Sequence, residues 1–170
     1  MKRFLFAAAL LLSLAAVSVS CTKEGPARFR GNYTFKTGGS LTVRPADDPE
    51  AESSTVYLAD ESGQMDVLVA DKSSGSMIIT MNALGGSVTT FDATADGSVL
   101  SISPQSRRVS LSLLGSSDAV RPSVTVEVSG TGVRYDDVLI LSLDYSGSYS
   151  LAGTEYEIIG SDIECVAKLN

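Results

Sequence analysis

The sequence contains no histidine and no tryptophan among its 170 residues, and only 6% of them are aromatic. Without histidine, the chain lacks the commonest general base, the commonest metal ligand and the side chain that titrates near neutral pH. We therefore expect no catalytic residue, no metal site and no cofactor, and we predict a protein that is not an enzyme. The length fits a single domain.

Positive charge is also scarce in this chain. Lysine and arginine together number 13 against 20 acidic residues, which gives a formal net charge of −7. Binding of nucleic acid depends on clustered basic side chains that neutralise phosphates. The composition therefore argues against a nucleic-acid partner.

The one long hydrophobic run lies at the N-terminus. Lys2 and Arg3 precede an apolar stretch from Phe4 to Leu14, and small residues follow up to Ser20. This order is typical of a secretory signal, because the apolar stretch is too short and wrongly flanked for a retained transmembrane helix. We assign residues 1–20 to this signal.

Cys21 follows the small residues directly, and this arrangement resembles the lipobox of bacterial lipoproteins with a type II signal peptide. The resemblance implies cleavage before Cys21, lipidation of Cys21 and anchoring of the protein to a membrane. Several acyl chains anchor a protein well, since each buried methylene contributes about 0.8 kcal/mol. The alternative is an ordinary secretory signal cut near Ala16 or Ser18, which would leave Cys21 as a plain cysteine.

Removal of the signal changes the composition of the mature chain. Loss of Lys2 and Arg3 leaves 11 basic and 20 acidic residues, so the net charge becomes −9. If Cys21 is lipidated, Cys165 has no partner in the chain, and its strand-like surroundings predict a small buried side chain. A Cys21–Cys165 disulfide is the alternative if lipidation fails. Gly25 and Pro26 break regular structure, so we assign residues 21–30 to a tether.

From Gly31 onward, apolar residues recur at every second position, which is the pattern of half-buried strands. No window after Cys21 shows helical periodicity, so we predict one antiparallel all-β domain over residues 31–170 with little or no helix. Glycine-rich or polar turns separate the runs at intervals of about ten residues. They include Thr37-Gly38-Gly39, Ser73-Ser74-Gly75, Gly85-Gly86, Asp96-Gly97, Gly115-Ser116-Ser117 and Ser146-Gly147-Ser148. We expect Thr37-Gly38-Gly39 to join the first two strands.

Gly31-Asn32-Tyr33 opens the first strand much as a Gly-x-Trp motif opens lipocalin-type barrels. The glycine and tyrosine rhythm from Val128 to Ile158 is similar to the closing strands of small calycin-like lipoproteins of Bacteroidetes-type bacteria. This resemblance implies a single antiparallel β-barrel, which would also remove exposed sheet edges. Tyr33 replaces the usual tryptophan and the chain has more than eight strand-like runs, so a two-sheet β-sandwich stays open as an alternative.

Three acidic segments are candidate sites. Asp92 to Gly97 imitates the start of a calcium loop, but Ser103 stands where the loop requires a bidentate glutamate, so a hairpin is favoured. The loop from Pro45 to Ser54 carries four acids and fits a solvated loop better than a metal site. Asp136 and Asp137 are neighbours that would point to opposite faces of a strand, so they fit a charge pair at a strand start better than a glycosidase pair.

The tyrosines are the remaining candidates for binding, because their rings combine apolar area with a polar hydroxyl. Their simplest alternative role is to cap the core in the absence of tryptophan. We predict a non-enzymatic lipoprotein of the bacterial outer membrane, at the periplasmic face or cell surface, that binds a small apolar ligand in or at the mouth of a barrel as a monomer. The alternative is a structural or adhesive surface module for a protein or glycan partner. The candidate ligand-binding residues are Tyr33, Tyr57, Tyr135, Tyr145, Tyr149 and Tyr156.

Overall fold

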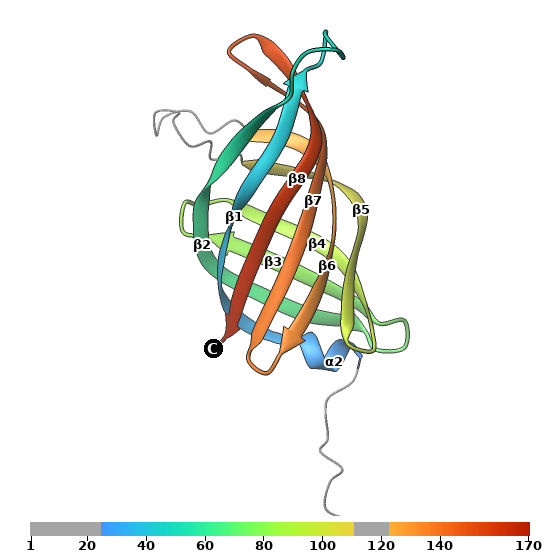
Figure 1. Ribbon diagram of the computed structural model, residues 1–170. Helices are drawn as coiled ribbons and strands as arrows, with labels where there is room; N and C mark the ends of the chain where they lie inside the picture. Colours follow the sequence, from blue (N-terminus) through green and yellow to red (C-terminus); the bar gives the residue numbers. More distant parts are fainter. Residues whose placement is uncertain (1–24, 111–122) are drawn as a thin grey trace, which may run out of the picture.

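The computed structural model describes residues 25–110 and 123–170, which form one closed antiparallel β-barrel of eight strands (Figure 1). Each strand pairs with the next along the chain, and β8 pairs with β1 to close the barrel. The predicted all-β barrel is thus confirmed, and the two-sheet sandwich is not the observed architecture. The strands are β1 Gly31–Pro45, β2 Ser54–Asp71, β3 Ser76–Ala83, β4 Val88–Asp96, β5 Val99–Ser110, β6 Ser123–Tyr135, β7 Val138–Leu151 and β8 Thr154–Leu169.

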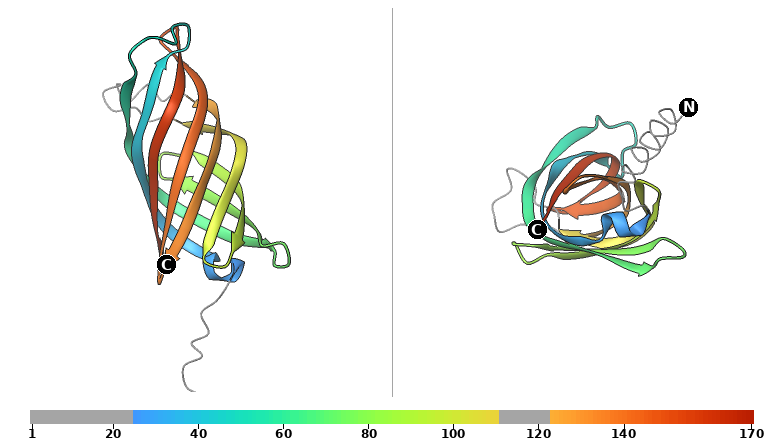
Figure 2. Two further views of the ribbon diagram at one scale, coloured as in Figure 1. Left: turned by 45° about the vertical axis from the view of Figure 1, so that its right-hand side comes forward. Right: turned by 90° about the horizontal axis from the view of Figure 1, so that it is seen from below.

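Helix is limited to one short segment in the described ranges. The four-residue helix α2, Pro26–Phe29, follows Gly25 and carries proline in its first turn, where the missing N–H costs no helical hydrogen bond. Seen from below, α2 lies across the lower end of the barrel (Figure 2). No helix in the described part of the chain is both long and apolar enough to cross a membrane. The predicted signal segment and Cys21 lie outside the described residues.

Two of the predicted turns are wrong, and the reason is that glycine bends a strand here. Thr37-Gly38-Gly39 lies inside β1, and Ser146-Gly147-Ser148 lies inside β7. Gly39 has a φ of 146° and lies so close to β8 that a Cβ there would be 2.0 Å from the carbonyl oxygen of Asp162. The ladder shifts register beside both glycine segments, so bulged strands replace hairpins. This is why more than eight strand-like runs form eight strands.

Most of the remaining turns are where the sequence predicts them. Ser73 to Gly75 joins β2 to β3, Gly85-Gly86 joins β3 to β4, and Asp96-Gly97 stands at the end of β4. Asp136 and Asp137 form the turn between β6 and β7 instead of starting a strand, because Asp136 adopts a positive φ of 50°. The predicted turn at Gly115-Ser116-Ser117 lies outside the described residues.

The hydrophobic core fills the inside of the barrel. Along β4, buried and exposed residues alternate, so Phe91, Ala93 and Ala95 face inward while the residues between them face solvent. The other strands contribute rows of the same kind, including Leu41 of β1 and Leu141 of β7. The barrel wall therefore separates a packed interior from a polar outer surface.

Candidate ligand-binding site inside the barrel

The lower end of the barrel is closed by α2 and its neighbours, and we call this region the closed end. Phe29 of α2 is fully buried, and the hydroxyl of Tyr33 donates a hydrogen bond to its carbonyl oxygen at 2.6 Å. Arg134 of β6 lies 5.8 Å above the Tyr33 ring and donates to the Tyr33 hydroxyl and to the carbonyl oxygen of Arg28. Arg28 in turn donates to the carbonyl oxygen of Arg134. This network fixes α2 under the barrel and seals that end.

A small cavity of about 40 Å³, partly open to solvent, lies among the inward-facing side chains, and we call it the interior cavity. Its apolar wall comes from several strands and includes Phe35, Met81, Phe91 and Leu143. A water molecule occupies about 30 Å³ in the liquid, whereas ligand pockets usually measure about 300–1,000 Å³. The cavity therefore has room for about one water molecule in this conformation, and a larger occupant requires side chains to move. Unbranched Met81 is suited to such movement. The full lining is Phe35, Thr37, Glu61, Met81, Ala83, Ser87, Thr89, Phe91, Leu143 and Tyr145.

Titratable groups gather on one side of the interior cavity. Burial raises the pKa of the Tyr145 hydroxyl, and the nearby Glu61 carboxylate and Cys165 thiol raise it further. Burial likewise raises the pKa of the Cys165 thiol to about 12, with a smaller contribution from Glu164. Cys165 is buried and free, and it stands opposite Thr37 of the cavity wall in the β1–β8 ladder. A thiol that holds its proton this firmly is a poor nucleophile at neutral pH.

The six tyrosines predicted to bind a ligand lie in separate places. Tyr33 belongs to the closed end, and Tyr145 lines the interior cavity. Tyr149 and Tyr156 face each other across β7 and β8 with ring centroids 5.5 Å apart. Tyr57 and Tyr135 are 61% and 64% exposed on the outside. Of the six, only Tyr145 lines the interior cavity.

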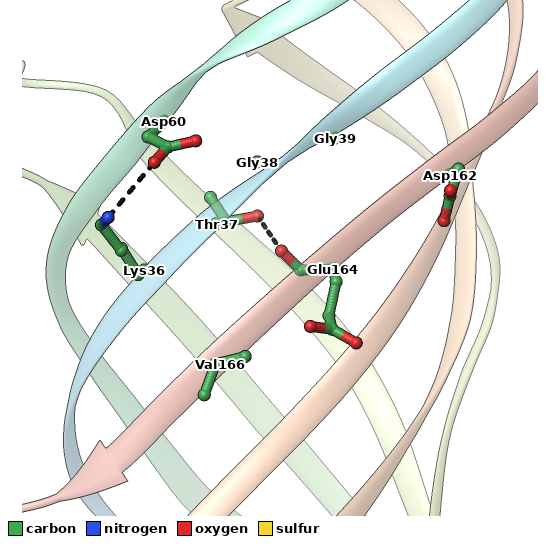
Figure 3. A pocket seen from close by; sticks show the side chains of 8 residues that line it. All are labelled: Lys36, Thr37, Gly38, Gly39, Asp60, Asp162, Glu164 and Val166. Atoms are coloured by element: carbon green, nitrogen blue, oxygen red, sulfur yellow. Dashed lines mark hydrogen bonds and ion pairs between the residues drawn. The ribbon is translucent and has the colours of Figure 1, made fainter.

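A second hollow of about 460 Å³ lies on the outer wall, over β2, β1 and β8, and we call it the outer hollow. Gly38 and Gly39 form its floor because they carry no side chain (Figure 3). Asp60 stands on one side, where Lys36 forms an ion pair with it at 3.2 Å, and Glu164 stands on the other side. Asp162 and Val166 complete the rim. The outer hollow is thus shallow and mainly acidic.

The acidic segments singled out in the sequence show no ligand-binding geometry. Asp92 to Asp96 is part of extended β4, and the Asp92 carboxylate forms an ion pair with Arg107 at 2.8 Å. In the loop after Pro45, a carboxylate oxygen of Asp48 accepts the backbone N–H of Glu50. Asp137 forms an ion pair with Lys168 at 3.8 Å. Within residues 25–110 and 123–170, no group of three or more acidic, cysteine or histidine side chains is arranged to hold a metal ion.

The sequence interpretation missed Glu61, although a signal for it was present. Counting back by twos from Met65 along β2 places Gly63 and Glu61 on the inward face. It also missed Gln105 and Arg107, whose side chains reach across to β4. Nothing in the local sequence identifies β4 as their partner, because that contact depends on how the strands diverge.

Comparison with protein-family models, with curated proteins and with solved structures finds no match for this chain.

Proposed function

We propose that the protein is a non-enzymatic, lipid-anchored lipoprotein of the bacterial outer membrane that binds a small, mainly apolar ligand in the barrel. The observation that carries the proposal is the interior cavity, which lies in a barrel closed at one end and joins an apolar wall to Glu61 and Tyr145. Such a lining suits a ligand with an apolar body and one polar group. The absence of histidine from the whole sequence supports a role in binding instead of catalysis.

The cavity volume of about 40 Å³ limits how the ligand binds. In the proposed complex, the apolar part of the ligand displaces Met81 and its neighbours, and the polar group stays beside Glu61 and Tyr145. Side chains with several rotatable bonds allow such displacement at low cost.

The proposed anchor also orients the barrel. Three residues separate Cys21 from Gly25, and an extended chain spans at most about 3.6 Å per residue, so the closed end would stay within about 15 Å of the membrane surface. The opposite end would then point away from the membrane. Incorporation of an alkyne-bearing fatty acid in cells tests the anchor, and it should disappear in the Cys21→Ala variant. Labelling that persists in this variant would contradict the assignment.

Ligand binding is tested with the full-length protein purified from its native membrane. Native mass spectrometry should show a bound small molecule, and the uncharged probe N-phenyl-1-naphthylamine should bind saturably. Ala83→Leu places extra atoms in the wall of the interior cavity and should weaken probe binding about tenfold or more, whereas Ala46→Leu in an exposed loop should not. Absence of both a co-purified molecule and saturable probe binding would refute the proposal.

The outer hollow favours a second candidate function, that of a surface module for a protein partner. Its volume of about 460 Å³ and its carboxylates suit a cationic side chain of such a partner. Cross-linking of intact cells through an amine-reactive and carboxyl-reactive reagent would capture this partner. Loss of the product in Glu164→Gln, but not in Glu127→Gln, would favour this function.

A further inference from the structure

The wall of the barrel is weakest between β4 and β5, and we call this boundary the β4–β5 seam. These strands pair only over Thr94–Asp96 and Val99–Ser101, next to the Asp96-Gly97 turn. Beyond Ser101, β5 is paired with β6 alone, and that ladder has a register shift between Ile102 and Gln105. Pro104 lies in that interval and has no backbone N–H to donate to a ladder. The two strands therefore diverge toward the end opposite α2.

Two side chains bridge the seam where the backbone ladder is missing. The side-chain amide of Gln105 accepts a hydrogen bond from the backbone N–H of Asp92 at 2.9 Å and donates one to the carbonyl oxygen of Asp92 at 2.7 Å. A primary amide has the same donor and acceptor groups as a peptide bond. Gln105 thus replaces one residue of the missing ladder.

Arg107 forms the second bridge. Its Nε donates to the carbonyl oxygen of Thr90, and its Nη2 donates to the Asp92 carboxylate at 2.8 Å. Arg107 stands opposite Val126 in the β5–β6 ladder, and Val126 is part of the buried core. The arginine side chain therefore starts from the inward-facing row of β5 and extends across the seam.

Hollows lie on both sides of β4 at this seam. Outside, a hollow of about 490 Å³ is lined by Ile78, Asp92, Pro104 and Gln105, among others. Inside, Thr89 and Phe91 of the same strand line the interior cavity. Movement of β5 away from β4 would connect the two spaces. Over most of the seam, this movement would break side-chain hydrogen bonds and not a continuous backbone ladder.

From this arrangement we propose that the β4–β5 seam is a lateral entrance to the barrel, held shut by Gln105 and Arg107, through which an apolar ligand reaches the interior cavity. The role in ligand entry rests on the proposed function, but opening of the seam is tested without any ligand. The closed end excludes entry past α2, where Phe29 and Tyr33 are fully buried.

Cys165 provides the test, because its thiol is fully buried beside the interior cavity. In full-length protein carrying Cys21→Ser, Cys165 is the single thiol, and its reaction with the small uncharged reagent methyl methanethiosulfonate reports access to the interior. The Gln105→Ala/Arg107→Ala variant should react at least tenfold faster than the parent. Urea titration of each variant separates this local opening from global unfolding.

Matched variants keep the test decisive. Arg44→Ala removes an arginine that bonds Glu157 across the β1–β8 boundary, where backbone pairing extends from Tyr33 to Pro45, and it should leave the Cys165 rate unchanged. Gln105→Glu preserves size but places a carboxylate against the carbonyl oxygen of Asp92, so it should accelerate the reaction even if the double variant does not fold. An unchanged rate in the Gln105 variants, or an equal acceleration in Arg44→Ala, would overturn the proposal.

Binding of N-phenyl-1-naphthylamine distinguishes the two proposals. If the Gln105 variants expose Cys165 but no variant binds the probe, the seam opens and the proposed ligand function fails. If the parent binds the probe and the Gln105 variants change neither the thiol rate nor the rate of probe uptake, the ligand function stands and the lateral entrance fails. Faster probe uptake together with faster thiol reaction supports both.

Discussion

Two boundaries between strands complete this barrel in different ways. At the β1–β8 boundary, paired residues run from Tyr33 to Pro45 of β1, which is nearly the whole strand. At the β4–β5 seam, pairing stops after Ser101, and side chains of Gln105 and Arg107 make the next bonds. Both boundaries close the wall. Opening the β1–β8 boundary breaks backbone hydrogen bonds, whereas opening most of the β4–β5 seam breaks only side-chain hydrogen bonds.

The sequence differences between the two boundaries are small. Adjacent glycines in β1 allow close approach to β8, whereas β5 carries Pro104 beyond Ser101, the last residue that it pairs with β4. A backbone ladder adds one hydrogen bond after another along both strands, while a side-chain bridge adds bonds at one position and also orders a flexible side chain. The comparison teaches that a closed barrel has boundaries of unequal strength, and that strand composition determines where the weak one lies.

The substitution Gly39→Ala should have the largest effect, because it strikes the strong boundary. The added Cβ would lie 2.0 Å from the carbonyl oxygen of Asp162 on a backbone with φ of 146°. Backbone strain and overpacking together should lower the free energy of unfolding by about 3 kcal/mol. Urea titration measures this loss. Gly38→Ala is the control, since its Cβ meets only the movable carboxylate of Asp60. Similar losses in both variants would contradict the account of the β1–β8 boundary.

Truncation of one buried valine beside each boundary compares them directly. Val43 of β1 and Val109 of β5 are both buried, so Val→Ala removes the same atoms at each site. We expect Val43→Ala to cost about 2.5 kcal/mol, because the paired strands around it cannot collapse into the space. Val109→Ala should cost about 1 kcal/mol, because the freer strand can move inward. The difference is measured by urea unfolding of the two variants, and a larger loss at Val109 would reverse the comparison.

Alkaline pH should destabilise the side of the barrel that contains Cys165. Burial raises the pKa of its thiol to about 12 and also raises the pKa of the Tyr145 hydroxyl. The unfolded thiol ionises near its ordinary pKa of about 8.5, so the folded state retains the proton and its stability is lost as pH rises from about 8.5 to 12. The thiol alone should cost about 2 kcal/mol between pH 8 and pH 10.

Unfolding titrations of the parent and of Cys165→Ala at both pH values test this dependence. At pH 8 the variant should have a lower free energy of unfolding than the parent, because it loses a packed sulfur atom. Between pH 8 and pH 10, its free energy of unfolding should then fall less steeply than that of the parent. Parallel pH profiles for the two proteins would exclude Cys165 as the source.

Periodicity in the sequence predicts the fold class well, because inward and outward rows follow directly from strand geometry. The alternation at Phe91, Ala93 and Ala95 needs no knowledge of the partner strand. Prediction of which strands pair requires information beyond this alternation. A pair of glycines reads as a hairpin in sequence, yet Gly38-Gly39 permits a bulge in one long strand, and only the approach of β8 distinguishes the two.

The sequence interpretation named Tyr145, which lines the interior cavity, but it missed residues whose position depends on contacts between distant strands. Arg134 meets Tyr33 although 101 residues separate them, and Gln105 meets Asp92 only because the ladder between β4 and β5 has ended. Composition correctly indicates that tyrosines are few and amphipathic, but it does not indicate which of them face inward. Which tyrosines face inward depends on how each bulge changes the alternation of inward and outward residues along its strand.

The smallest expected effect concerns an exposed ion pair on the other side of β1, where Lys36 of β1 meets Asp60 of β2. Lys36 and Asp60 lie 3.2 Å apart, and their side chains are 71% and 67% exposed. Exposed pairs contribute little, because water and salt screen the charges and ordering two side chains costs entropy. Lys36→Ala should therefore lower the free energy of unfolding by less than about 0.5 kcal/mol, and by still less in high salt. A loss comparable to that of Gly39→Ala would mean that side chains on the outer wall, and not the backbone ladder alone, hold β1 in place. The contrast between a boundary held by backbone bonds and one held by side chains would then lose its basis.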